Sequence, residues 1–222
     1  GLSCHIGSQI FEINIFEKAF IKMKEAIEIF KSNNLKIKQL DLGGGFGVAW
    51  DINQIELDLS KLAVLVNNIY SNSEFNISFE PGRYLVANAG FLVTKILTTK
   101  KNGDTNFLIT DAGMNTLLRP AMYNADHKII PFNQNGENIV YTVAGPICES
   151  SDVLAKNIAL PLQKRDNFLI ICGVGAYGSV MASNYNSKCL PTEVLVNHDQ
   201  YAIIRKQEKI ESIIEKDLLP QW

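Results

Sequence analysis

The feature that most constrains the fold of this chain is the alternation of short apolar runs with amphipathic segments in its first 85 residues. Residues 12–32 predict a helix, because their apolar side chains recur at steps of three and four residues. The runs 35–42 and 75–79 predict strands that end in three glycines and in Glu-Pro-Gly-Arg, and the segment around 62–69 between them predicts a second helix. This alternation predicts a parallel α/β sheet. Polar residues after each strand are typical of a (β/α) barrel, which carries its functional groups at the carboxyl ends of its strands.

A different pattern begins at about residue 86. Short β-rich runs separated by Gly, Asn and Asp replace the long helices, at 91–97, 106–110, 139–144, 168–172 and 193–197. We therefore predict two domains, in which residues 1–85 form the C-terminal part of an α/β barrel and residues 86–222 form a β-rich domain. The charged stretch 206–219 predicts a terminal helix with an isoleucine stripe.

The composition argues against several classes of function. A net charge of -2 without a lysine- or arginine-rich run argues against nucleic-acid binding. No apolar run approaches the ~20 residues of a transmembrane helix, so no membrane association is expected. The four cysteines are widely spaced without a C-x-x-C pair, which predicts neither a metal site nor a disulfide framework. A reducing cytoplasm is the expected compartment.

A glycine cluster, Gly43-Gly44-Gly45-Phe46-Gly47, follows the strand predicted at 35–42. Glycines let a backbone approach an anion closely, and consecutive N–H groups form a cradle for phosphate. The spacing fits neither the dinucleotide fingerprint nor a P-loop. Phosphate binding and a simple tight turn both remain open for this cluster.

Two further motifs follow predicted strands. Glu80 and Arg83 flank Pro-Gly, and they suit either a carboxylate that keeps a pyridine nitrogen protonated beside an anion grip, or a surface ion pair. His5 and Ser8 suit stacking on a flat ring and binding of its phosphate, although a lone histidine is more often a core or surface residue.

The second half carries three candidate groups. Arg119 and Tyr123 are four residues apart, which places both on one face if the segment is helical, as a clamp for a carboxylate or as a locally packed turn. Cys148 is a candidate proton donor next to Glu149, a candidate partner for an ammonium group; the alternative is a buried cysteine beside a surface glutamate. Tyr177 lies between small residues, where its hydroxyl suits a phosphate.

Taken in order over essentially the whole chain, these motifs resemble those of the fold-type III pyridoxal-phosphate decarboxylases, and within them the diaminopimelate decarboxylases. The resemblance implies an α/β barrel followed by a β domain, with pyridoxal 5'-phosphate as cofactor. It implies that His5 stacks on the cofactor ring, and that Glu80 pairs with the pyridine nitrogen. The phosphate and the rest of the cofactor would be held by Ser8, Gly43, Gly44, Gly45, Gly82, Arg83 and Tyr177.

The same resemblance assigns Cys148 as the proton donor and implies a homodimer, in which Cys148 and Glu149 complete the active site of the partner subunit. The substrate would be bound by Arg83, Arg119, Tyr123, Glu149 and Tyr177. Meso-2,6-diaminopimelate, which would be decarboxylated to L-lysine, has a distal amino-carboxylate end that needs both an anion grip and an ammonium partner. Ornithine and lysine carry a bare distal ammonium, so an arginine there would weaken their binding; an ornithine- or lysine-type decarboxylase is the alternative.

The family's Schiff-base lysine has no matching motif in this sequence, and the chain begins at Gly1, directly in a strand-like run that carries a site motif. Chain termini are where order is weakest, so we expect a chain that is cut inside a domain and lies after that lysine. Without the lysine the chain alone is expected to be inactive. A non-catalytic remnant, or a homologue that docks on an intact enzyme, is the other hypothesis.

Overall fold

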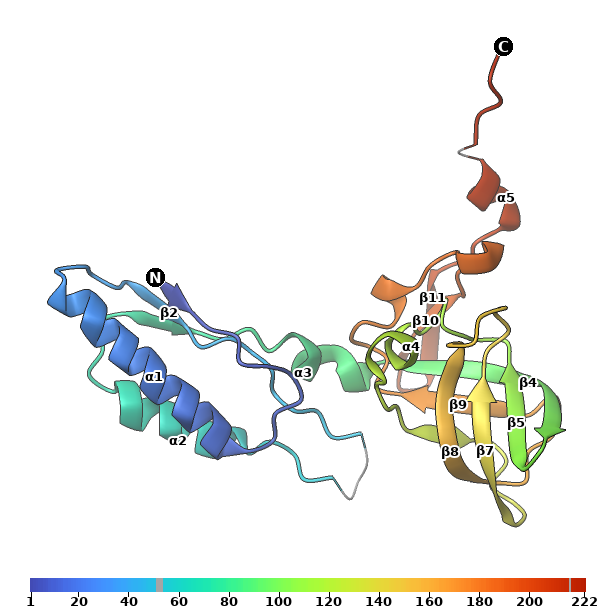
Figure 1. The fold of residues 1–222 in the computed structure, drawn as a ribbon, viewed down its shortest axis with the longest axis horizontal. Coiled ribbons are helices and arrows are strands. Elements are labelled where there is room, and N and C mark those ends of the chain that lie inside the picture. Colours follow the sequence, from blue (N-terminus) through green and yellow to red (C-terminus); the bar gives the residue numbers. More distant parts are fainter. Residues whose placement is uncertain (51–53, 216) are drawn as a thin grey trace. The chain divides into compact units, whose positions relative to one another are not determined.

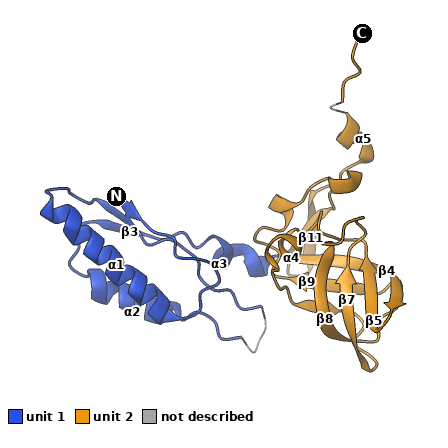
Figure 2. Cartoon of the chain, in the orientation of Figure 1, with its two compact units in different colours: residues 1–90 blue, residues 91–222 orange. Residues whose placement is uncertain are grey.

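The computed structural model describes residues 1–50, 54–215 and 217–222. The chain divides into two compact units, residues 1–90 and residues 91–222 (Figure 2). Each unit has its own sheet and its own hydrophobic core. We describe the two units separately.

Unit 1 is a three-stranded parallel sheet with two long helices (Figure 1). Its elements are β1 (Leu2–Ser3), α1 (Ile13–Ser32), β2 (Gln39–Asp41), α2 (Leu59–Tyr70), β3 (Asn76–Ser78) and α3 (Gly82–Val86), followed by a 3-10 turn at Ala87–Ala89. The predicted strand–helix alternation and parallel sheet are confirmed. The strand predicted over 35–42 is shorter than expected, because β2 pairs with its neighbours only over three residues.

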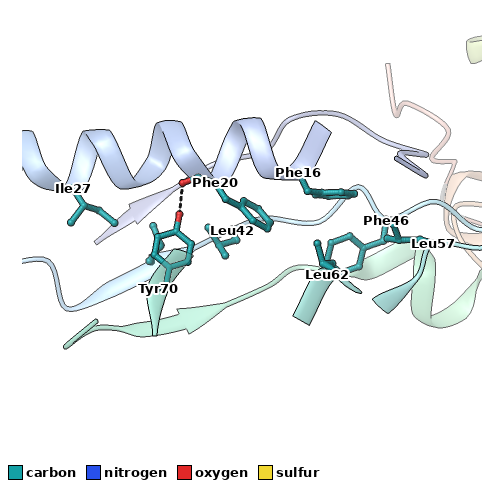
Figure 3. Close-up of a cluster of buried hydrophobic side chains, with 9 residues drawn as sticks. Phe16, Phe20, Ile27, Leu42, Phe46, Leu57, Leu62 and Tyr70 are labelled. Atoms are coloured by element: carbon teal, nitrogen blue, oxygen red, sulfur yellow. Dashed lines mark hydrogen bonds between the residues drawn. The ribbon is translucent and has the colours of Figure 1, made fainter. Parts of the chain in front are cut away.

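The register of the sheet explains which face is covered. Leu40 of β2 pairs with Leu2 and with Ile77, so these apolar residues lie on one face. Phe16 and Phe20 of α1 are fully buried in the cluster that also contains Leu40 (Figure 3). The helical spacing of the apolar residues in 12–32 therefore places the buried side of α1 against this face of the sheet.

Tyr70 closes this core from the last turn of α2. Its hydroxyl donates a hydrogen bond of 2.6 Å to the backbone carbonyl of Phe20 (Figure 3). Burial raises the pKa of Tyr70 to about 12 from an ordinary value of 10.0, because the phenolate would lose its hydration. A raised folded-state pKa stabilises the fold below pH 10, and this contribution is lost as the pH rises through 12.

Replacing Tyr70 by phenylalanine should therefore cost about 1 kcal/mol of unfolding free energy at neutral pH, the value of one hydrogen bond. The difference from the parent should shrink above pH 10, where the parent begins to lose its own contribution. Denaturant titrations followed by circular dichroism at several pH values measure both effects. Tyr201→Phe is the matched control, since Tyr201 is 78% exposed. A constant difference up to pH 12 would count against the hydrogen bond as the cause.

Unit 2 is built on a six-stranded sheet of order β6-β9-β4-β5-β7-β8, with a separate hairpin (Figure 1). Its elements are β4 (Phe91–Asn102), β5 (Thr105–Thr110), α4 (Arg119–Tyr123), β6 (Ile129–Pro131), β7 (Asn138–Ala144), β8 (Val153–Pro161), β9 (Phe168–Cys172), β10 (Glu193–Asn197), β11 (Gln200–Arg205) and α5 (Ile210–Ile214), with 3-10 turns at Ser179–Met181 and Tyr185–Ser187. All five β runs expected from the sequence form strands. The mixed α/β class is confirmed.

Strand direction in unit 2 decides where its loops meet. β4 is antiparallel to both β5 and β9, and β5 is parallel to β7. The strands β5, β7 and β9 therefore run in the same direction. The carboxyl ends of β5 and β7 lie at the same edge of the sheet, whereas β9 pairs with the first half of β4, Phe91–Lys95, and ends farther along it.

Two expectations for unit 2 were incomplete or wrong. The sequence did not predict β8, because the polar residues Lys156 and Asn157 interrupt its apolar run. In the structure, Asn157 has a left-handed φ of 55° within this strand. The helix expected over 206–219 is only α5, five residues long. Its isoleucines Ile210 and Ile214 are 49% and 59% exposed, so the stripe lacks the packing that would extend so short a helix.

The β10–β11 hairpin is paired in itself but carries apolar side chains in solvent. Val196, Tyr201 and Ile204 are 66%, 78% and 60% exposed. Exposed apolar groups of this size in one element are typical of an interaction surface.

Candidate functional site

In unit 1 the predicted site residues gather at the carboxyl edge of the sheet. His5 follows β1, the glycine cluster follows β2 and Glu80 follows β3. Because the three strands are parallel, the three loops that follow them leave the same edge. The topology therefore brings together the groups that the sequence places at 5, 43–45 and 80.

The glycine cluster is required by contacts between these loops. A Cβ added to Gly43 would lie 2.1 Å from the carbonyl oxygen of Cys4, and one added to Gly44 would lie 2.0 Å from the carbonyl oxygen of Glu80. A Cβ at Gly45 would lie 2.2 Å from the carbonyl oxygen of Gly7. Gly43 and Gly45 also have left-handed φ values of 72° and 84°. The sequence left a phosphate cradle and a tight turn open; close loop packing by itself explains why side chains are excluded here.

Backbone hydrogen bonds hold the three loops in register. The amide of Glu80 donates to the carbonyl of Gly43 at 2.8 Å, and the amide of Ile10 donates to the carbonyl of Gly45 at 2.9 Å. The side chain of Gln9 forms two hydrogen bonds with the backbone of Val48, at 3.0 and 3.2 Å. The backbone around the candidate site is therefore fixed, while the side chains of His5, Ser8 and Glu80 are exposed at its surface.

The Glu-Pro-Gly-Arg sequence turns β3 into α3. The amide of Gly82 donates to the carbonyl of Glu80 at 2.9 Å, and the amide of Leu85 donates to the carbonyl of Pro81 at 3.2 Å. Arg83 is half-buried in the first turn of α3. The turn places Glu80 at the strand end and Arg83 at the start of a helix.

In unit 2 the predicted groups follow three strands that run in the same direction. Arg119 lies beyond β5, Cys148 and Glu149 lie beyond β7, and Tyr177 lies beyond β9. β5 and β7 end at the same edge of the six-stranded sheet, and β9 ends farther along β4. The amide of Ser183, in the segment after Tyr177, donates to the carbonyl of Asn115, in the loop before Arg119, at 2.8 Å.

Arg119 and Tyr123 are the two ends of the helix α4, as the four-residue spacing suggested. Pro120 starts this helix, and Asn124 ends it with a left-handed φ of 49°. Arg119 is 6% exposed, whereas Tyr123 is 60% exposed. Arg119 is therefore enclosed by other residues of the protein, whereas Tyr123 is exposed to solvent.

His127 is a contact of Arg119 that sequence reasoning missed. Its Nδ1 lies 2.9 Å from the carbonyl oxygen of Cys172, which only accepts, so Nδ1 carries the proton and Nε2 accepts from Arg119 Nη1 at 3.4 Å. The contact joins two residues eight positions apart on different elements. The helix α4 ends at Tyr123, between the two residues, so no helical or strand pattern in the sequence relates them.

Cys148 and Glu149 lie at the exposed tip of the loop after β7. Exposure of Cys148 contradicts the alternative of a buried apolar cysteine. The amide of Ser151 donates to Glu149 Oε1 at 3.3 Å. This hydrogen bond holds the pKa of Glu149 below its usual value, so the carboxylate is ionised at neutral pH. A charged carboxylate beside an accessible thiol is the arrangement expected for binding an ammonium group next to a proton donor.

Tyr177 lies in a tight turn between Gly173 and Gly178. Its φ is 61°, in the left-handed region, and a Cβ at Gly178 would lie 2.3 Å from the carbonyl oxygen of Val174. The turn buries Ala176 and leaves Tyr177 45% exposed. The flanking glycines therefore shape the turn that presents the phenol.

An apolar groove of about 360 Å³ in unit 1 borders the candidate site, since its lining residues Phe79 and Pro81 flank Glu80. It is lined by α2 together with Phe46, Phe79 and Pro81. None of the predicted polar groups lines it, so it does not define the chemical site.

Two structural absences concern residues 1–50, 54–215 and 217–222. Over that part of the chain, no three His, Cys, Asp or Glu residues are grouped so as to hold a metal ion. Over the same part, no helix has the length and apolar character needed to cross a membrane.

Comparison with known proteins places the chain among decarboxylases. A family described as "Pyridoxal-dependent decarboxylase, C-terminal sheet domain" matches residues 27–175. A diaminopimelate decarboxylase of Aquifex aeolicus is 38% identical over 219 residues, which cover 98% of this chain and 52% of that protein. One of Haemophilus influenzae is 39% identical over 215 residues, which cover 96% of this chain and 52% of that protein.

Solved structures have the same fold. The diaminopimelate decarboxylase from Helicobacter pylori complexed with L-lysine has a TM-score of 0.87 at 36% identity, covering 96% of this chain and 53% of its own. A lysine/ornithine decarboxylase from Vibrio vulnificus complexed with cadaverine has a TM-score of 0.75 at 28% identity, covering 84% of this chain and 51% of its own. The chain spans about half the length of the relatives that it matches.

Proposed function

The chain belongs to the family of pyridoxal-dependent decarboxylases, and on this basis we propose that it contributes the cofactor cradle and the substrate grip of an enzyme that decarboxylates meso-2,6-diaminopimelate to L-lysine. The observation that carries the proposal is the convergence of the polar motifs. In each unit, every predicted site residue follows the carboxyl end of a strand. The three strands of unit 1 share one sheet edge, and in unit 2 the strands β5 and β7 do so.

The groups on the edge of unit 1 fit a phosphorylated pyridine. The glycine loop excludes side chains, which suits the close approach of a phosphate held together with Ser8. An imidazole at His5 and a carboxylate at Glu80 suit an aromatic ring with a basic nitrogen. Gly82, Arg83 and Tyr177 complete the set that would hold the cofactor. Bound pyridoxal phosphate supplies an electron sink for the bond that breaks when carbon dioxide leaves.

The groups of unit 2 suit the distal end of the substrate. Arg119 supplies a planar fork of donors for the distal carboxylate, and the hydroxyl of Tyr123 supplies a second donor. The ionised Glu149 would neutralise the distal ammonium, and Arg83 would bind the substrate from unit 1. The thiol of Cys148 would deliver a proton to the carbon that has lost its carboxyl group.

A dicarboxylic substrate is favoured over ornithine or lysine by the presence of Arg119. A bare distal ammonium would meet a guanidinium of the same charge. We therefore propose diaminopimelate as the substrate, in agreement with the higher identity to the diaminopimelate decarboxylases than to the lysine/ornithine decarboxylase.

We propose a homodimer in the cytoplasm as the working form. The exposed apolar residues of the β10–β11 hairpin support a surface that a partner covers. The exposed position of Cys148 and Glu149 supports their use in the site of a second subunit.

The function is tested by carbon dioxide release from meso-diaminopimelate and from ornithine by the native gene product. Release from diaminopimelate is expected to be much faster. Faster release from ornithine would overturn the proposal that diaminopimelate is the substrate. Release from neither compound would overturn the proposed decarboxylase activity. Borohydride reduction in the presence of pyridoxal phosphate, followed by peptide mapping, locates the lysine that bonds to the cofactor, which we propose lies outside this chain.

Replacing Arg119 by glutamine should raise the KM for diaminopimelate about 10- to 100-fold, because a hydrogen bond to a charged group is lost. The KM for ornithine should not rise. Arg165→Gln is the control, since Arg165 has a 77% exposed side chain. Circular dichroism of both variants checks folding. Equal changes in KM for the two substrates would contradict the role of Arg119 as a carboxylate grip.

A further inference from the structure

Asp152 is a buried carboxylate to which the proposed chemistry gives no role. It lies four residues after Cys148, at the start of β8, and is 3% exposed. The amide of Met114 donates to Oδ1 at 2.6 Å, and the amide of Ile147 donates to Oδ2 at 2.7 Å. The two oxygens of one side chain therefore join the loop after β5 to the loop after β7.

Both loops are built closely around this carboxylate. A Cβ added to Gly113 would lie 2.6 Å from Asp152 Oδ1, and one added to Gly145 would lie 2.4 Å from Oδ2. Neither glycine has a left-handed φ, so close contacts are what exclude a side chain at these two positions. These contacts are with the carboxylate at both positions, and at Gly145 also with the backbone Cα of Gly113 at 2.4 Å.

The contacts continue from Asp152 to the groups that would act on the substrate. On one side, the amides of Thr116 and Leu117 both donate to the carbonyl of Gly113 at 2.9 Å, in the turn that leads directly into α4 and Arg119. On the other side, the amide of Glu149 donates to the carbonyl of Ile147 at 2.8 Å, within the turn that contains Cys148.

The backbone of Asp152 closes the second turn. Its amide donates to the carbonyl of Glu149 at 3.1 Å, and its carbonyl accepts from the amide of Gly145 at 3.0 Å. Asp152 therefore contacts both ends of the Cys148 loop and also the loop before Arg119.

We propose that Asp152 is a positioning residue that sets the place of the Cys148–Glu149 turn relative to the loop carrying Arg119. The inference rests on the proposed function for its catalytic consequence, but not for the contact itself. Cys148 and Glu149 lie on the same turn, so the position of that turn determines whether the thiol and the carboxylate reach the substrate together. A misplacement of about 1 Å at such a site costs about 10²-fold in rate.

Ionisation of Asp152 is opposed by burial, which raises its pKa, and favoured by the two amide hydrogen bonds, which lower it; nearby Glu149 raises it further. Both oxygens face N–H donors. An asparagine of the same size would turn an NH₂ group toward one of the two amides and release that loop.

Asp152→Asn in the native gene product is expected to lower kcat for diaminopimelate about 10²-fold with little change in KM. A second measurement does not need activity: the alkylation rate of the Cys148 thiol, followed by peptide mapping, should change at least about fivefold because the surroundings of the thiol change. Asp111→Asn is the matched control. Asp111 also accepts two hydrogen bonds, from Thr94 Oγ1 at 2.6 Å and the amide of Lys95 at 2.9 Å, but it does not hold the turn.

Unchanged alkylation and unchanged kcat in Asp152→Asn would overturn the positioning role while leaving the proposed function standing. The same changes in Asp111→Asn would also overturn it, because they would reflect general loosening of the unit. If the parent protein shows no decarboxylation, the proposed function fails and the alkylation rates still decide the role of Asp152. If Asp152→Asn does not fold, hydrogen exchange in the unaltered protein decides. Slow exchange at the Met114 and Ile147 amides relative to Ser150 supports the role, and exchange as fast as at Ser150 overturns it.

Discussion

Replacing Gly44 by alanine should lower the free energy of unfolding of unit 1 by about 3 kcal/mol, the upper range for overpacking in a fixed environment. The new Cβ would lie 2.0 Å from the carbonyl oxygen of Glu80, a backbone atom that no side-chain rotation relieves. The contact relaxes only if the ends of β2 and β3 separate. Their separation would break the 2.8 Å hydrogen bond from Glu80 to Gly43 and the 3.0 Å hydrogen bond from Leu42 to Ser78.

The variant should also lose cofactor binding, because the separated loops are those that carry Glu80 and the glycine cluster. Thermal unfolding followed by circular dichroism reports mainly unit 1, which contains the two longest helices, α1 and α2. Absorbance of bound pyridoxal phosphate in the native gene product reports the cradle. Gly103→Ala is the control, since its Cβ would meet no atom within 4 Å and only the left-handed φ of 55° costs about 1 kcal/mol. A Gly44 variant as stable as this control would refute the packing argument.

Replacing Cys148 by alanine should lower carbon dioxide release about 10²- to 10⁴-fold, the usual contribution of a positioned proton donor. Stability should be unaffected, because the side chain is exposed at the tip of its loop. Cys189→Ala, which removes a half-buried thiol outside the candidate site, is the matched control. Full activity in the Cys148 variant would exclude the thiol as the proton donor.

The same variant tests whether sites are shared between subunits. A mixture of Cys148→Ala with Glu80→Ala, each inactive alone, should recover about a quarter of the parent activity, because half of the dimers are mixed and one of their two sites is intact. No recovery after exchange of subunits would mean that each site is built within one chain.

A helix could be predicted from the sequence where the apolar pattern of its own residues corresponds to a face that is buried. The apolar residues of α1 recur on one face because one face is buried, so the bounds expected at 12–32 differ from the observed Ile13–Ser32 by one residue. The helix expected at 206–219 has the same kind of apolar stripe, but its isoleucines do not pack against a core. Of the residues described in this stretch, only five are helical. A periodic pattern therefore shows that a face is apolar, and not whether a surface exists to bury it.

The candidate site shows the same division. The sequence identified Cys148 and Glu149 from their chemistry, but it carried no signal for the role of Asp152. The role of Asp152 depends on the amide of Met114, thirty-eight positions away, and on the parallel pairing of β5 with β7 that brings the two loops together. His127 was missed for a similar reason, since its contact with Arg119 follows from the position of the carbonyl of Cys172.

By itself, the sequence determined the kinds of chemical group, their order along the chain, the two long helices and the strands that precede the site motifs, because periodicity and turn residues act over a few positions. The tertiary structure alone decided that three strand ends share an edge in unit 1 and that β5 and β7 end together in unit 2. It also decided that the glycines at 43–45 are needed for loop contacts, and that one buried carboxylate joins the proton-donor turn to the loop before Arg119. These features depend on strand direction and register, which are set by hydrogen bonds between residues distant in sequence.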